Sequence, residues 1–318
     1  GVRVNAPSCN TGLKSPTGVG VAALNLTKVD RLAFSARCSE ALLYGTLKDV
    51  FSRVGKVSMA SWGRGAHGFT NAASLTVDGA LAATLCWGGQ QQRGKSYADV
   101  SGLGCQLLGD VAPLVEVAST VKDSNIRRVD IAADFYDGSI SHESVQAAYW
   151  SGGFLRSGRP PKMTKIESAD PSDGKTVYIG VRGNDQLLRG YEKGLKEVKD
   201  LDLGDPDTVT FQIDGKVVDP RNWYRLELEL RAKTRPIPWE TVGLRDQYFT
   251  GAYPYLQTVY PGISPELLIT PQKAGELTLN KALSHIQRQY GNTLYTALVA
   301  ADGDIGAVWD RIVGKQLS

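Results

Sequence analysis

The chain has 318 residues, of which 42% are hydrophobic and 22% charged, and its formal net charge is +3. This length predicts one large or two medium domains with a hydrophobic core, and the composition is ordinary for a soluble globular protein. No apolar stretch approaches the roughly 18 residues of a membrane span, so no membrane association is expected. So small a net charge does not by itself indicate a nucleic-acid partner.

Four cysteines are widely spaced along the chain, with no CxxC pair and no signal peptide ahead of them. They are Cys9, Cys38, Cys86 and Cys105. This pattern predicts reduced thiols and a cytoplasmic protein.

The first half of the chain alternates strand and helix patterns. Residues 29–38 form a predicted strand, and the helix that follows can end at Gly55. Glycine turns separate short predicted strands within 58–109, and a second helix is predicted within 109–123. This order predicts strand, helix, several strands and helix.

The second half begins in the same way and ends in helices. A helix is predicted over 141–150, with Ser141 as its N-cap. Residues 195–222 are charged and contain Gly, Asp and Pro, which predicts a loop or small hairpin. After two prolines near residue 236 the pattern turns helical. The predicted C-terminal helices are 239–260, 277–300 and 305–314.

Four segments are predicted as strands that share one polar face: residues 128–135, 175–183, 187–194 and 224–233. Strand side chains alternate between faces with period two, so the side chains two apart in each segment lie together. The polar face receives Asp130, Asp134, Thr176, Tyr178, Arg182, Arg189, Tyr191, Lys193, Arg225, Glu227, Glu229 and Arg231. The opposite face is apolar and predicts the core: Val129, Ile131, Val177, Ile179, Val181, Leu226, Leu228 and Leu230.

This polar face has two interpretations. It is either the solvated side of an antiparallel sheet or a site built from four carboxylates, two tyrosines and several cations. Carboxylates without histidine are hard oxygen ligands, which suit Mg or Mn better than Zn. A divalent ion beside a phenol and guanidinium groups is suited to attack on a phosphodiester.

Two further segments are candidates for contact with DNA. A basic run next to Pro160 and Pro161 could follow a phosphate backbone or could be a solvated loop; its residues are Arg156, Arg159, Lys162 and Lys165. Arg182, Arg225 and Arg231 on the polar face are candidate phosphate contacts as well. The aromatic, glycine-rich residues 61–69 could stack on bases or could belong to the core and turns of the N-terminal sheet.

The polar strands also carry three motifs: RxDxAxD from Arg128 to Asp134, YxGxRxxD followed by RxYxK from Tyr178 to Lys193, and RxExEL from Arg225 to Leu230. Together they resemble the replication initiation factor family, the rolling-circle initiators of staphylococcal plasmids and some filamentous phages. The resemblance covers about residues 125–233. Gly190 departs from it, because plasmid relatives have an apolar residue there.

The resemblance implies a site-specific endonuclease that nicks one strand of a replication origin in a bacterial host. The tyrosine of RxYxK, here Tyr191, would attack the scissile phosphate and stay joined to the DNA 5′ end. Asp130, Asp134 and Glu227 would hold a divalent metal, Mg or Mn, with Glu229 next in order. DNA and a host helicase are the implied partners.

The residues themselves agree with this chemistry. Arg189 and Lys193 flank Tyr191, and their charges could favour phenolate and bind the developing charge on phosphate. Tyr178 is the alternative nucleophile, and Tyr224 is expected on the opposite face. Two other functions stay open, namely an origin- or operator-binding protein without catalysis and a hydrolase that uses Glu227 and Glu229 as acid and base.

The predicted fold is α+β: antiparallel sheets with helices packed on one face, the active site on the open face, and a helical C-terminal region. Residues 1–124 are predicted as an N-terminal α+β half for structure or DNA binding. Residues 125–235 are predicted as the catalytic half and 236–318 as the helical region. The regions outside the catalytic half are expected to supply duplex recognition or the contacts of a homodimer.

Overall fold

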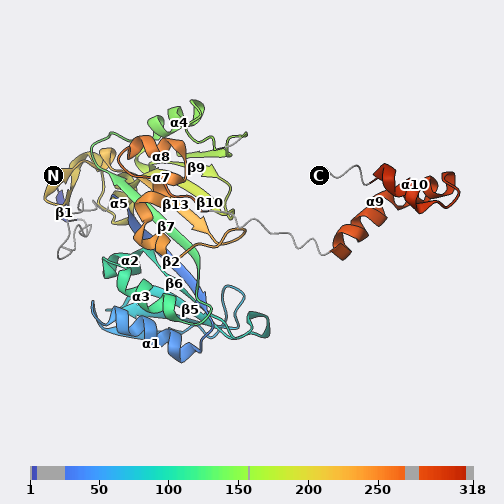
Figure 1. Cartoon of the computed structure of the whole chain (residues 1–318). Coiled ribbons are helices and arrows are strands. Elements are labelled where there is room, and N and C mark those ends of the chain that lie inside the picture. The colour runs from blue at the N-terminus through green and yellow to red at the C-terminus, as the bar shows by residue number, and fades with distance from the viewer. Residues whose placement is uncertain (1, 6–25, 157, 269–278, 313–318) are drawn as a thin grey trace, which may run out of the picture. The chain divides into compact units, whose positions relative to one another are not determined.

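The computed structural model describes residues 2–5, 26–156, 158–268 and 279–312. By its contacts the chain divides into two units, residues 1–270 and 271–318. The second unit contains helices α9 (Leu279–Ala300) and α10 (Ile305–Ile312), which confirms the helical C-terminal region (Figure 1). Residues 277–278 and 313–314 of the predicted helices lie outside the described residues. No described helix is long and apolar enough to cross a membrane.

A ten-stranded sheet dominates the first unit, with strand order β3-β4-β5-β6-β2-β7-β13-β10-β9-β8. Every neighbouring pair in it is antiparallel. Its strands are β2 (Lys28–Ala36), β3 (Val57–Ser61), β4 (Asn71–Val77), β5 (Ala80–Trp87), β6 (Ser96–Val100), β7 (Asn125–Phe135), β8 (Met163–Glu167), β9 (Lys175–Gly180), β10 (Gln186–Glu192) and β13 (Tyr224–Arg231). A small sheet of β1 (Val2–Asn5), β11 (Val209–Ile213) and β12 (Lys216–Val218) accompanies it. The two predicted halves of the chain therefore share one sheet, joined where β2 pairs with β7.

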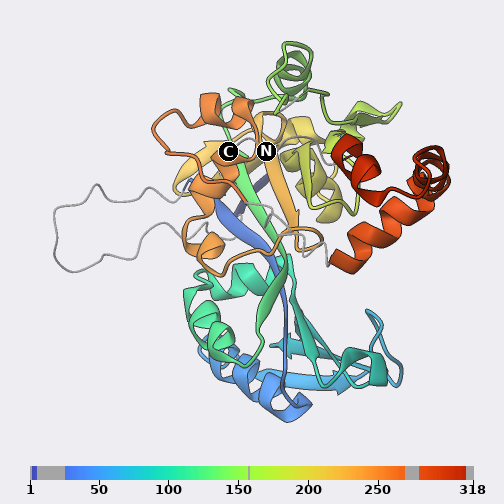
Figure 2. The same ribbon diagram turned by 45° about the vertical axis from the view of Figure 1, so that its right-hand side comes forward.

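One hydrophobic cluster covers one face of this sheet and contains nearly all of the apolar residues predicted for the core. Figure 2 shows the helices of the N-terminal part on one side of its strands. The helices of the first unit are α1 (Glu40–Phe51), α2 (Gly102–Leu108), α3 (Ala112–Thr120), α4 (His142–Trp150), α5 (Lys193–Asp200), α6 (Glu240–Gly243), α7 (Arg245–Gly251) and α8 (Pro254–Val259). As predicted, Ser141 caps α4 and accepts a hydrogen bond from the backbone N–H of Ser144. The α+β class predicted from the sequence is confirmed.

Several local predictions were wrong. The predicted helix 239–260 is divided into α6, α7 and α8, with Pro254 at the start of α8, and residues 195–200 of the predicted loop belong to α5. Residues 102–108 form helix α2 and not a strand, because Ser101 accepts the backbone N–H of Gly104 and starts a helix. The predicted strand over 187–194 ends at Glu192, so that Lys193 is the first residue of α5. Gly180 has a φ of +113°, which ends β9 and leaves Val181 exposed in a turn.

Two β-bulges change which side chains reach the polar face. Between Val29 and Arg31 the strand β2 carries an extra residue, Asp30, opposite one residue of β7. A second shift adds Arg127 to β7 opposite β2. A bulge places two consecutive side chains toward the same side of a strand. Asp30 and Arg31 can therefore both make contacts on the polar face, which strict alternation excludes.

Gly190 lies under the ring of Tyr224, on the face opposite to Tyr191. A Cβ at Gly190 would lie 2.7 Å from the Tyr224 hydroxyl and 3.1 Å from a methyl group of Leu226. Tyr224 is buried, as expected for the opposite face, and its hydroxyl has no hydrogen-bond partner among the described residues. The glycine is therefore explained by packing within the core.

Gly190→Ala is expected to lower the free energy of unfolding by about 1–3 kcal/mol, because the added methyl group overpacks a buried contact. Urea denaturation at neutral pH measures this change. Tyr224→Phe removes the nearest atom, so Gly190→Ala should cost less in the Tyr224→Phe background than in the wild type. Equal costs in both backgrounds would contradict the packing explanation.

Candidate active site

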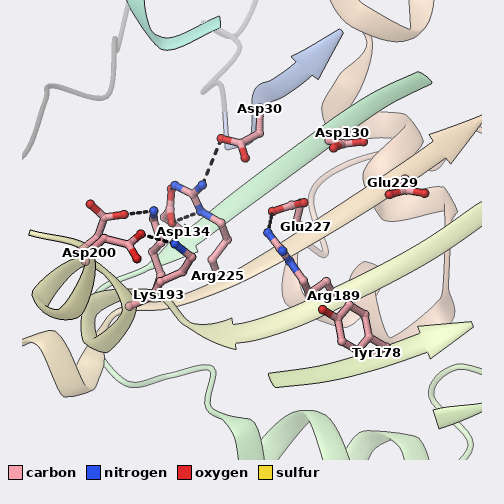
Figure 3. A network of polar contacts seen from close by, with 12 residues as sticks. Asp30, Asp130, Asp134, Tyr178, Arg189, Lys193, Asp200, Arg225, Glu227 and Glu229 are labelled. Atoms are coloured by element: carbon pink, nitrogen blue, oxygen red, sulfur yellow. Dashed lines mark hydrogen bonds and ion pairs between the residues drawn. The ribbon is translucent and has the colours of Figure 1, made fainter. Parts of the chain in front are cut away.

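The strand register aligns the predicted site residues in rows across β7, β13, β10 and β9 (Figure 3). In one row Glu227 lies opposite Arg189, which lies opposite Tyr178. In the next, Arg225 is flanked by Asp134 on one side and Tyr191 on the other. Asp130 and Glu229 face each other in a third row. The register therefore brings together the strand residues that the sequence predicted to share a face.

Arg189 connects the candidate metal ligands to the candidate nucleophile. One of its terminal nitrogens donates a hydrogen bond to Glu227 over 2.5 Å, and its guanidinium carbon lies 4.4 Å from the centre of the Tyr191 ring. Tyr178 is held separately, because its hydroxyl accepts a hydrogen bond from Arg182 over 2.6 Å. Arg189 thus contacts Tyr191 directly, whereas Arg182 is engaged with the rival tyrosine.

A buried ion-pair network surrounds Asp134. Arg225 donates to both of its carboxylate oxygens, over 2.7 and 2.9 Å, and Lys28 lies 2.9 Å away. The indole N–H of Trp223 donates to it over 2.9 Å, and Arg225 also reaches Asp30 over 3.1 Å. Burial alone would raise the pKa of Asp134, but the charges of Arg225 and Lys28 hold it well below the usual range. This carboxylate is therefore ionised and already satisfied by four donor contacts from three residues.

Tyr191 is only 5% exposed. Burial raises its pKa to about 12, against the opposing charges of Arg225 and Arg189. Burial, together with the charge of Arg225, lowers the pKa of Lys193, although Glu197 pairs with it one helical turn on. These surroundings therefore favour the neutral phenol at neutral pH, and further positive charge beside it would favour phenolate.

Three carboxylates, Asp130, Glu227 and Glu229, form the candidate metal-binding group (Figure 3). Burial, and then the charges of Glu227 and Glu229, raise the pKa of Asp130 to about 6 although Arg128 opposes this. Arg128 pairs with both Asp130 and Glu229, at 2.6 and 2.7 Å, and Arg231 pairs with Glu229. Like charges crowded in this way favour a cation.

The donor set fits a hard divalent cation such as Mg or Mn, because it consists of carboxylate oxygens. In the described residues no three His, Cys, Asp or Glu side chains are already arranged as metal ligands. Arginines supply the counter-charge instead, so binding of a cation requires Arg128 and Arg189 to move away from these carboxylates.

A pocket of about 500 Å³ opens beside Tyr191. Its walls come from β2, α2, the end of β7, β10, α5 and the residues around Trp223, and they include Arg189, Lys193 and Arg225. A volume of this size is in the usual range of small-molecule sites. The buried phenol thus has an approach from solvent.

The candidate DNA contacts fall into two groups. The basic run is exposed at Arg156, Arg159, Lys162 and Lys165, and Arg182 is exposed too, so these residues are accessible to a partner. Arg225 and Arg231 are held in ion pairs on the sheet. In residues 61–69, Trp62 is 39% exposed, and Phe69 stacks on Tyr97 with ring centres 6.1 Å apart.

Sequence reasoning missed several members of the site. Lys28 and Asp30 join the Asp134 network, and Arg31 makes two hydrogen bonds to Asp99 on the same face. A bulge leaves no signal in the alternation of one strand, because it depends on the pairing of two strands. The motif RxDxAxD did contain Arg128, whose role as partner of Asp130 was not predicted.

Comparisons with known proteins found one family and a similar solved structure. Residues 124–263 match the model of the replication initiation factor family. A solved structure of the rolling circle replication initiator protein from Geobacillus stearothermophilus is similar, with a TM-score of 0.47 and 19% identity, over 64% of this chain and 74% of that chain. No curated protein sequence matches the chain. The family match spans β7, β9, β10 and β13, the strands that carry the candidate site.

Proposed function

We propose that this chain is a rolling-circle replication initiator that nicks one strand of an origin and later rejoins it. The observation that carries the proposal is the position of Tyr191. It lies in the family-matched segment, beside a pocket, with Arg189 against its ring and Lys193 and Arg225 in the same pocket. A phenol among cations is the arrangement expected for covalent capture of a phosphate.

In the nicking step the Tyr191 hydroxyl oxygen forms a bond to the scissile phosphorus and the bond from phosphorus to the 3′ oxygen breaks. The phenol loses its proton and the departing 3′ oxygen gains one. Arg189 and Lys193 would bind the non-bridging oxygens and hold the phosphate in line. The DNA keeps a free 3′ hydroxyl, and reversal of the same exchange reseals the strand.

Asp130, Glu227 and Glu229 would hold a divalent Mg or Mn. When bound, such an ion supplies the charge that stabilises phenolate and the phosphate oxygens. Asp134 was also predicted as a ligand, and that role is untested. Its contacts with Arg225, Lys28 and Trp223 support instead a role in positioning Arg225 beside Tyr191. A host helicase and a second subunit are proposed partners that would act after the nick.

The carboxylate group leads to a prediction about metal. Asp130→Asn is expected to weaken Mn binding at least about tenfold, because it removes one of three carboxylate ligands and its negative charge. Isothermal titration with Mn measures the change. Asp99→Asn is the matched control, since Asp99 is also buried and paired with an arginine, Arg31. Equal affinities in the wild type and Asp130→Asn would remove Asp130 from the metal site.

The function is tested by a covalent-adduct assay. The protein is incubated with single-stranded oligonucleotides from candidate origins, with Mn or with EDTA, and separated on a denaturing gel. Protein joined to DNA in the presence of Mn alone is the expected result. Tight binding without any adduct would favour the alternative function, an origin-binding protein without catalysis.

A further inference from the structure

We propose that the pocket beside Tyr191 is a nucleoside-binding subsite, which holds one unpaired nucleotide next to the scissile phosphate. The inference rests on the proposed nicking function and adds to it a binding site for a base. In this view the protein captures the strand by enclosing one nucleotide, and the phosphate of that nucleotide is thereby delivered to Tyr191.

The size and walls of the pocket suit a nucleoside. Its volume is about 500 Å³, and its lining is part aromatic, part aliphatic and part polar. Tyr136 is partly exposed in the wall, and its ring packs on the buried Trp223 with ring centres 5.5 Å apart. Leu103 and Gln106 of α2 line it as well. Aromatic faces stack on bases of any sequence, and polar side chains can bond to base edges.

The charges of the pocket favour a base over a run of phosphates. Most of its basic side chains are already paired with carboxylates. The pairs are Lys28 and Arg225 with Asp134, Arg225 with Asp30, Lys193 with Glu197, and Lys196 with Asp200. A groove that follows a DNA backbone needs cations free to bind successive phosphates. Arg189 is paired too, with Glu227 outside the lining of the pocket. The nearly balanced charge therefore favours a neutral base in the interior, with at most one phosphate beside Tyr191.

The burial of Tyr191 also favours an unpaired nucleotide. Its side chain is 5% exposed and lines the pocket, so a phosphate that reacts with it has to approach from the pocket side. A phosphate in a base-paired duplex brings both neighbouring base pairs with it, which makes a close approach to a buried side chain difficult. An unpaired nucleotide turned out of the stack can approach more closely, at the cost of a few kcal/mol of unstacking.

Gln106→Trp tests this inference, because it adds a large side chain to the pocket at an exposed position of α2 and leaves Tyr191, the carboxylates and the paired cations unchanged in sequence. Glu116→Trp, at an exposed position of α3 that does not line the pocket, is the matched control. Leu103→Trp fills the pocket from the same helix and serves if Gln106→Trp does not fold, as judged by circular dichroism. Saturation-transfer NMR with the four deoxynucleoside 5′-monophosphates reports binding, with deoxyribose 5-phosphate as the probe that lacks a base.

Wild type and Glu116→Trp are expected to transfer saturation to the base protons, whereas Gln106→Trp should lose at least about fivefold of that signal. Adduct formation in the presence of Mn, with single-stranded oligonucleotides from the candidate origins, should fall at least tenfold in Gln106→Trp and not in Glu116→Trp. If the wild type binds the bases but forms no adduct, the subsite is supported and the nicking function is overturned. If Gln106→Trp changes neither the amount of adduct nor the binding of bases, the subsite is overturned and the nicking function is still supported.

Discussion

Tyr191→Phe is expected to abolish the covalent adduct, with a loss of at least about 1,000-fold, because it removes the only oxygen that can join this side chain to phosphorus. The substitution keeps the ring, its contact with Arg189 and its burial, so the fold should be unchanged. DNA binding should also persist, which separates loss of chemistry from loss of affinity. The denaturing-gel assay with Mn and an oligonucleotide cut by the wild type measures the adduct.

Tyr178→Phe is the matched control for this result. Tyr178 lies on the adjacent strand β9, opposite Arg189, and its hydroxyl is engaged by Arg182. This variant should keep most of the adduct. The reverse pattern, with adduct present in Tyr191→Phe and absent in Tyr178→Phe, would move the nucleophile one strand over. Loss in both variants would contradict the assignment of Tyr191 as the sole residue needed for the adduct, because Tyr178 would then be required for the same step.

Asp134→Asn is expected to lower the free energy of unfolding by about 3–5 kcal/mol, because it leaves the buried Arg225 and the nearby Lys28 without their main counter-charge. Arg225 is only 4% exposed, so water cannot replace the lost carboxylate. Urea denaturation at pH 7 measures the loss. If Asp134 instead served mainly as a metal ligand, the apo protein would lose little stability and the loss would appear only in the presence of Mn.

Asp200→Asn provides the comparison for this second result. Asp200 also pairs with a lysine, Lys196, but both side chains are about half exposed. Exposed ion pairs contribute about 0–1 kcal/mol. Asp200→Asn should therefore change the free energy of unfolding little. Similar losses of stability in Asp134→Asn and Asp200→Asn would contradict the ion-pair network described around Arg225.

The polar face of the site could be predicted from the sequence because strand side chains alternate in a fixed way. That rule placed Glu227, Arg189 and Tyr178 on one face without knowledge of the strand order. The motifs then assigned chemical roles that alternation alone cannot give, and those roles stay predictions. The antiparallel sheet confirms the predicted strands, and the family model matches the segment that contains the motifs.

Other parts of the site depend on contacts between distant segments and could not be predicted. The bulge at Asp30 exists only because β2 pairs with β7, about 100 residues later in the chain. Lys193 follows the same alternation as Tyr191, yet it starts a helix because Leu195 and Val198 are buried on one side of α5. The strand pattern and the helix pattern compete at such a junction, and tertiary packing decides between them.

The junction of β2 and β7 has a consequence for how the protein could be divided or evolve. A fragment of residues 125–235 would leave one edge of β7 with unpaired backbone groups, a template for self-association. It would also lose Lys28 and Asp30, which stabilise the Asp134 network from the other half. Residues 28–36 thus complete the sheet and the ion-pair network of residues 125–235, and exchange of either segment alone between relatives is expected to disrupt both.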